Sequence, residues 1–161
     1  MTRHRGGRSG RSGSRICAMV AACATAALAL VSAPAASALP PYGNYAMNIQ
    51  GRYDFHTWIW VLSPCTNPGD CVSVTAIPQP IAKALHYRGE APLVDGHYTL
   101  TIDDPFGLRC GNVYYGPTIP THDVYTWDAT TLVGSMQSSF DVGCDGTPGG
   151  TFTYPFDLSR M

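Results

Sequence analysis

Hydrophobic and polar residues alternate along most of the chain beyond residue 44. In "HYTLTID", Tyr98, Leu100 and Ile102 lie on one face of an extended segment, and the residues between them are polar. A repeat of two residues is typical of β-strands that bury one face. The same repeat in "TLVGSMQSSFDV" and "TFTYPFDL" predicts two further strands, and Pro155 in the second indicates an edge strand or a bulge.

The segment "RYDFHTWIWVL" differs from this pattern. It alternates at its start and then becomes apolar at every position from Trp58 to Leu62. A continuous apolar run is typical of a strand covered on both faces. We therefore expect both sides of this strand to be buried near Leu62.

Taken together, the patterns predict about seven short strands separated by turn signals such as Asp95-Gly96. A helical turn would fit only at 81–86, and an eighth strand fits around 84–88. The chain therefore predicts a single all-β domain over 39–161, an antiparallel β-sandwich or small β-barrel of seven to eight strands. The seven predicted strands are 45–50, 52–62, 71–77, 95–102, 123–128, 131–141 and 151–158.

Residues 1–38 predict a cleaved secretory signal peptide. A basic segment with five arginines and no acid precedes the apolar run "ICAMVAACATAALALV" and the small-residue site Ala36-Ser37-Ala38. The apolar run is shorter than the roughly 20 residues that cross a bilayer. We expect cleavage before Leu39. A rival lipoprotein site at Cys23 would leave apolar residues where a polar tether normally follows.

Removal of this segment changes the charge of the protein. The full chain has a formal net charge of −1, but residues 39–161 hold five of the ten bases and all 11 acids, a net charge of −6. The remaining bases are scattered and form no patch for a phosphate backbone. We therefore expect neither nucleic acid nor an anionic membrane surface as a partner, and no integral membrane segment after cleavage.

The four cysteines that remain are Cys65, Cys71, Cys110 and Cys144. An even number in an exported chain predicts disulfides, and their spacing suits neither a zinc site nor a redox pair. The turn residues between Cys65 and Cys71 favour a bridge between these two, which leaves Cys110 for Cys144. Three pairings are formally open to four cysteines.

The order of these segments resembles a group of small secreted proteins of mycobacteria and related actinobacteria. The resemblance rests on "GRYDFHTWIWVLSPC", "DGHYTLTIDD", "CGN", "YTWDATTLVGSM" and "FTYPFDL". It spans nearly all of residues 39–161, but the shared motifs consist of glycines, tryptophans and cysteines. The resemblance therefore implies export toward the cell envelope or the medium, and it implies no chemistry and no site residue.

The sequence contains none of the common enzyme signatures, such as G-x-S-x-G, H-E-x-x-H or a P-loop. Each of the histidines at 56, 86, 97 and 122 fits a surface or packing role. Asp103 and Asp104 should point to opposite faces of a strand and cap a turn. We expect no catalytic residue, no metal site and no cofactor.

Aromatic residues are the remaining candidates for ligand contact. Trp58, Trp60 and Trp127 could line a ligand site or fill the core, and Tyr114 and Tyr115 lie in a connection where at least one should be exposed. We expect a secreted binding module for an apolar or glycan ligand of the envelope. The alternative is a structural or protein–protein interaction domain, and a hydrolase ranks third. A large pocket beside the tryptophans would favour the first, and a filled core with an exposed apolar patch the second.

Overall fold

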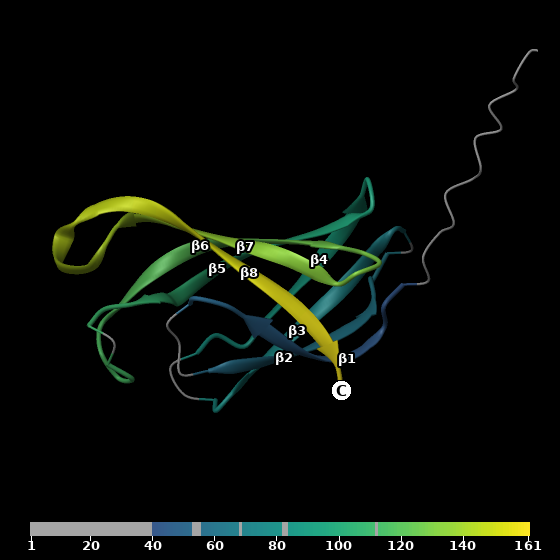
Figure 1. Ribbon diagram of the computed structural model, residues 1–161, viewed down its shortest axis with the longest axis horizontal. Coiled ribbons are helices and arrows are strands. Elements are labelled where there is room, and N and C mark those ends of the chain that lie inside the picture. The colour runs from purple at the N-terminus through teal and green to yellow at the C-terminus, as the bar shows by residue number, and fades with distance from the viewer. Residues whose placement is uncertain (1–39, 53–55, 68, 82–83, 112) are drawn as a thin grey trace, which may run out of the picture. The chain divides into compact units, whose positions relative to one another are not determined.

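The computed structural model describes residues 40–52, 56–67, 69–81, 84–111 and 113–161. Eight antiparallel strands close into a barrel in which each strand pairs with the next and β8 pairs with β1 (Figure 1). The strands are β1 (Gly43–Ile49), β2 (Thr57–Pro64), β3 (Cys71–Gln79), β4 (Tyr87–Val94), β5 (His97–Arg109), β6 (Thr118–Asp128), β7 (Val133–Val142) and β8 (Pro148–Arg160). The all-β prediction is confirmed, and of the two predicted architectures, sandwich and barrel, the structure shows the barrel.

The alternation in the sequence becomes the inside and the outside of this barrel. In β3, for example, Val72, Val74 and Ala76 are buried and the intervening residues are half-buried. In a closed barrel each strand buries only its inner face, so the expectation that β2 is covered on both sides is wrong. Ile59 and Val61 lie on its outer face and remain half-buried.

Strand limits differ from the predicted ones where pairing, rather than alternation, decides them. The eighth strand is β4, and it begins at Tyr87 instead of 84. β5 continues past 102 to Arg109 because its last residues pair with the start of β6 around a bulge. The expected helical turn at 81–86 lies partly outside the described residues, and residues 81 and 84–86 are not helical. No described segment forms a helix long and apolar enough to span a membrane.

The barrel has two ends with different connections. The terminal end carries the start of β1, the end of β8 and the connections 65–70, 95–96 and 129–132. Its tightest turn is Asp95-Gly96, with φ of 49° and 80°, a pair of left-handed residues that matches the twist of a two-residue hairpin. The mouth is the end at which β1, β3, β5 and β7 finish and the following strands begin, and two long hairpins extend from it at the left of Figure 1.

Each end of the barrel has one disulfide, and both predicted pairings are confirmed. Cys65–Cys71 closes the β2–β3 connection at the terminal end. Cys110–Cys144 joins the β5–β6 hairpin to the β7–β8 hairpin at the mouth, across 34 residues of sequence. The second bridge therefore holds together two hairpins that are separate in the chain.

Aromatic rings fill the middle of the barrel. Trp60 is fully buried, and its ring centroid lies 5.3 Å from that of Tyr125, 5.4 Å from that of Trp127 and 5.8 Å from that of Phe156. Tilted and edge-on contacts of this kind favour aromatic packing. Trp60 Nε1 donates a hydrogen bond to Tyr87 Oη at 3.0 Å, which satisfies one buried polar group within the rings.

Candidate functional site

Three polar side chains point into the barrel at the mouth because they continue the alternation of the core. Asp104 follows Ile102 by two residues on β5, and Asp123 and Ser138 hold the same inward phase on β6 and β7. All three are buried, and Asp123 is 0% exposed. Ser138 Oγ donates a hydrogen bond of 2.6 Å to Asp123 Oδ1. Two carboxylates are thereby brought into a protein interior, where a charge is costly unless it is compensated.

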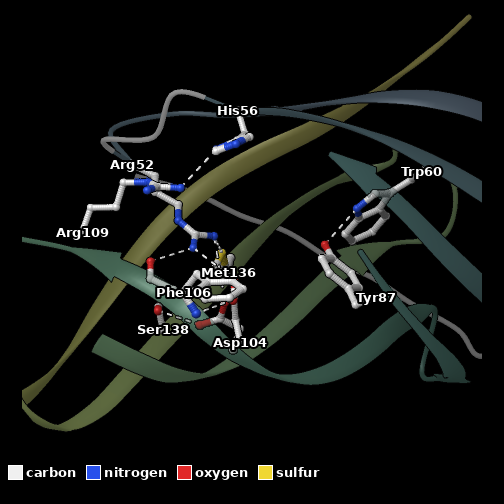
Figure 2. Close-up of polar contacts among 11 residues, drawn as sticks. Arg52, His56, Trp60, Tyr87, Asp104, Phe106, Arg109, Met136 and Ser138 are labelled. Atoms are coloured by element: carbon white, nitrogen blue, oxygen red, sulfur yellow. Dashed lines mark hydrogen bonds and ion pairs between the residues drawn. The ribbon is translucent and has the colours of Figure 1, made fainter. Parts of the chain in front are cut away.

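Arg52 supplies the compensating positive charge from the β1–β2 connection. Its Nη2 lies 3.7 Å from Asp104 Oδ2, and its Nη1 lies 3.9 Å from Asp123 Oδ2. The guanidinium also covers the ring of Trp58 at 5.7 Å from the centroid, and Nη1 approaches Met136 Sδ at 3.4 Å. Figure 2 shows this cluster at a distance from the Trp60–Tyr87 pair of the core.

The bulge in β5 gives the arginine a carbonyl acceptor. Pairing between β5 and β6 shifts register between Asp104 and Leu108, and the Gly107 carbonyl there accepts a 2.8 Å hydrogen bond from Arg52 Nη2. Gly107 has to be a glycine because a Cβ at this position would overlap the Thr121 side chain. Asp104 Oδ1 accepts the Phe106 N–H at 2.8 Å, so the buried carboxylate also stabilises the bulge.

A second group lies farther out at the mouth. Arg109 Nη1 donates to the Tyr114 carbonyl at 2.8 Å, and Nη2 lies 3.3 Å from His56 Nδ1. Because arginine has no acceptor, His56 Nδ1 is the acceptor in this hydrogen bond. The rings of His56 and Tyr114 stack at 5.5 Å, and Tyr115 meets Tyr114 edge-on at 4.6 Å. This group covers the outer side of the mouth with aromatic surface.

One cavity lies where β6 and β7 diverge. The two strands pair from Trp127 with Gly134 as far as His122 with Ser139, and beyond that pair they separate into two arms that Cys110–Cys144 rejoins. We call this opening the fork: residues 118–122 of β6 and 139–142 of β7. It holds a cavity of about 390 Å³, lined by inward-facing Asp104, Thr121 and Phe140 and by outward-facing Asp103, His122 and Asp141.

Two further hollows lie at the mouth. One of about 300 Å³ lies beside β1 and is lined by Met47, Asn48, Arg52 and His56, among others. The other, of about 410 Å³, lies under the β7–β8 hairpin and is mainly apolar, with Leu108, Phe140 and Phe152 in its wall. The charged cluster of Arg52 and Asp104 therefore lies between two openings, one reached from β1 and one through the fork.

One His–Asp pair at the fork has the composition of a catalytic triad but a different geometry. Asp103 Oδ1 lies 2.7 Å from His122 Nδ1, and Ser139 is the neighbour of His122 on β7. Ser139 Oγ, however, donates its hydrogen to the His122 carbonyl at 3.1 Å. A serine nucleophile has to give that hydrogen to the imidazole. Both members of the pair are also exposed, so the arrangement is a hydrogen-bonded surface contact beside the cavity.

The structure separates the aromatic residues that the sequence singles out. Trp58, Trp60 and Trp127 are buried core residues, and none of them lines the three hollows described above. These hollows therefore do not provide the pocket beside the tryptophans that would favour a binding module. Tyr114 is half-buried, and Tyr115 is 67% exposed at the mouth, as expected for at least one of the two. Among the described residues, Cys65, Cys71 and Glu90 are the group with metal-ligand atoms close together, but both sulfurs are in the disulfide.

Sequence reasoning missed the buried polar and charged residues, although the pattern contained a signal for three of them. Asp104, Asp123 and Ser138 are polar residues in the apolar phase of their strands, which marks them as inward-facing. Arg52 and Arg109 carry no such signal because they reach the mouth from a connection and from a strand end. The approach of Arg52 and Arg109 to the residues of the mouth depends on barrel closure. No family model, curated protein or solved structure matches the chain.

Proposed function

We propose that this protein is an exported binding module that holds a glycan in the fork cavity. The observation that carries the proposal is the cavity of about 390 Å³ between β6 and β7, which combines carboxylates with an aromatic ring. Its size falls within the range of small-molecule sites. Rigid strands and a disulfide hold its two arms, which limits the entropy lost when a ligand binds.

The lining chemistry suits a sugar. Asp103, Asp104 and Asp141 carry oxygens that can accept hydroxyl hydrogens, and charge-assisted hydrogen bonds of this kind are the stronger ones. Phe140 gives an apolar surface that matches the C–H face of a pyranose ring. Tyr115, exposed on the next connection, offers a further aromatic contact for a longer chain.

An apolar ligand inside the barrel is less well supported. The rings of Trp60, Trp127, Tyr125 and Phe156 are within contact distance of one another, so side chains already occupy the position that a lipid tail would take. We infer export and a location at the envelope or in the medium from the leader sequence, and two disulfides are compatible with an oxidising compartment.

Native mass spectrometry of protein purified from its secretion medium tests for a retained ligand, because a bound glycan adds its mass to the intact chain. Calorimetric titration with neutral, acidic and amino-sugar oligosaccharides then identifies the class. Asp141→Asn and Phe140→Leu should each weaken binding about tenfold or more, since each removes one polar or aromatic contact.

Asp95→Asn is the matched control, because it makes the same chemical change in the turn at the opposite end of the barrel. It should leave binding unchanged. The proposal fails if no oligosaccharide class binds, or if Asp95→Asn and Asp141→Asn weaken binding equally while both variants stay folded.

A further inference from the structure

β8 has a neighbour on both sides over only part of its length. β1 pairs with residues 156–160, and the last bond on that side runs from Gln50 N to the Pro155 carbonyl at 2.9 Å. Residues 149–154 pair with β7 alone. Within the described part of the chain, no backbone hydrogen bond reaches their other side. Figure 1 shows this part of β8 in the hairpin that extends to the left of the β8 label.

The alternation of the strand shows which groups face the unpaired side. Because the Pro155 carbonyl points toward β1, the N–H and C=O groups of Thr153, Thr151 and Gly149 point the same way. The N–H and C=O groups of the residues between these three point toward β7 and bond to it. We call residues 149–154 the β8 edge. It offers three consecutive donor–acceptor pairs in the geometry of an antiparallel ladder.

Among the described residues, the β8 edge lacks several of the features that prevent strand addition. Natural edges carry lysine or other charges, bulges or a covering segment, whereas "GGTFTY" has no charge. Its residues from 149 to 153 are exposed on both faces, and Phe152 is 45% exposed. Pro148 and Pro155 stand at its two ends. They limit any added ladder to six residues, since proline cannot donate a hydrogen bond.

We propose that the β8 edge pairs with the β8 edge of a second copy, antiparallel across a two-fold axis. A two-fold axis places each strand against an identical one. Because the segment is uncharged, no like charges meet in the ladder, although the chain has more acids than bases. Thr151 and Thr153 of one copy then face threonines of the other, a favourable cross-strand pair. The dimer leaves the fork open because the fork lies on the far side of β7.

Sedimentation of the disulfide-bonded protein over about a hundredfold range of concentration tests this proposal, because a reversible dimer dissociates on dilution. The expected result is twice the monomer mass at high concentration and the monomer mass at low concentration. Thr153→Pro removes an N–H that β7 does not use, and Thr151→Lys places a charge on the edge. Each should give the monomer mass at every concentration.

Gln137→Lys is the matched control, since it adds the same charge on β7, which is paired on both sides. It should leave the dimer intact. Hydrogen exchange gives a readout within one strand: the Thr151 and Thr153 amides should gain protection in the dimer, while the Phe152 and Tyr154 amides are protected throughout. A wild-type monomer at all concentrations overturns the proposal. A dimer that survives both edge variants also overturns it. The proposal fails as well if the protein stays a monomer and the Thr151 and Thr153 amides gain protection only when a peptide of unrelated sequence is added.

Discussion

The two halves of the barrel interior obey the same alternation but are filled with opposite chemistry. Toward the middle and the terminal end, Trp60 and its neighbours form a packed set of rings with an internal hydrogen bond. Toward the mouth, Arg52 faces two carboxylates at 3.7 and 3.9 Å. Ring packing stabilises a fold directly, whereas the attraction between buried charges mainly offsets the free energy of removing those charges from water. The comparison suggests that the first half provides stability and the second half provides specificity.

The sharpest test of the packed half is Trp60→Ala. Loss of a fully buried tryptophan removes its contacts and leaves a cavity, so we expect the free energy of unfolding to fall by about 3–5 kcal/mol. Urea denaturation followed by circular dichroism measures the change. Tyr115→Ala at the mouth is the control, because exposed substitutions usually change stability by about 0.5 kcal/mol or less. Equal losses would contradict the division between the halves.

Arg52→Met tests the charged half. Without the guanidinium, Asp104 and Asp123 remain buried beside each other, and we expect a loss of about 3 kcal/mol near neutral pH. Arg52→Lys keeps the charge and should recover part of the stability. An equal loss in Arg52→Lys would mean that Arg52 acts through its shape and packing and not through its charge.

Alkaline pH should act on the packed half through its tyrosines. Burial raises the pKa of Tyr87 well above its usual value of 10, and burial also raises the pKa of Tyr125. The unfolded chain therefore loses these protons first as pH rises. Their contribution is complete below pH 10 and is lost above it, by about 1.4 kcal/mol per pH unit for each tyrosine.

The measurement is urea denaturation at a series of pH values from neutral to alkaline. Tyr125→Phe should flatten the alkaline decline because it removes one of the two groups that titrate. Tyr154→Phe is a milder comparison, since Tyr154 is only partly buried and its pKa is raised less. An unchanged slope in Tyr125→Phe would show that other groups cause the decline.

The two disulfides extend the comparison to the ends of the barrel. Chain entropy assigns about 3.8 kcal/mol to the long loop of Cys110–Cys144 and about 2.4 kcal/mol to the short loop of Cys65–Cys71. Replacing the first pair with alanine should therefore lower the free energy of unfolding by about 1.4 kcal/mol more than replacing the second, and the melting temperature should fall further. Calorimetry measures both variants. A lower melting temperature for the short-loop variant would mean that Cys65–Cys71 anchors more than its own turn.

Much of the fold could be predicted from the sequence because a barrel buries one face of every strand. The phase of "HYTLTID" fixes the inward residues of β5, and local turn chemistry places Cys65 beside Cys71. Barrel closure could not be predicted, since it depends on pairing between β1 and β8 from opposite ends of the chain. For the same reason the fork and the approach of Arg52 to Asp104 were not predictable.

The position of the last residue has a practical consequence. Met161 N donates to the Asn44 carbonyl at 3.0 Å, so the C-terminus is fixed at the end of the barrel opposite the fork. A protein attached to a sensor surface or a bead through Met161 would present the mouth to the solution. Affinity reagents, display scaffolds and labels joined at this residue would therefore leave the cavity accessible from outside, without a long spacer.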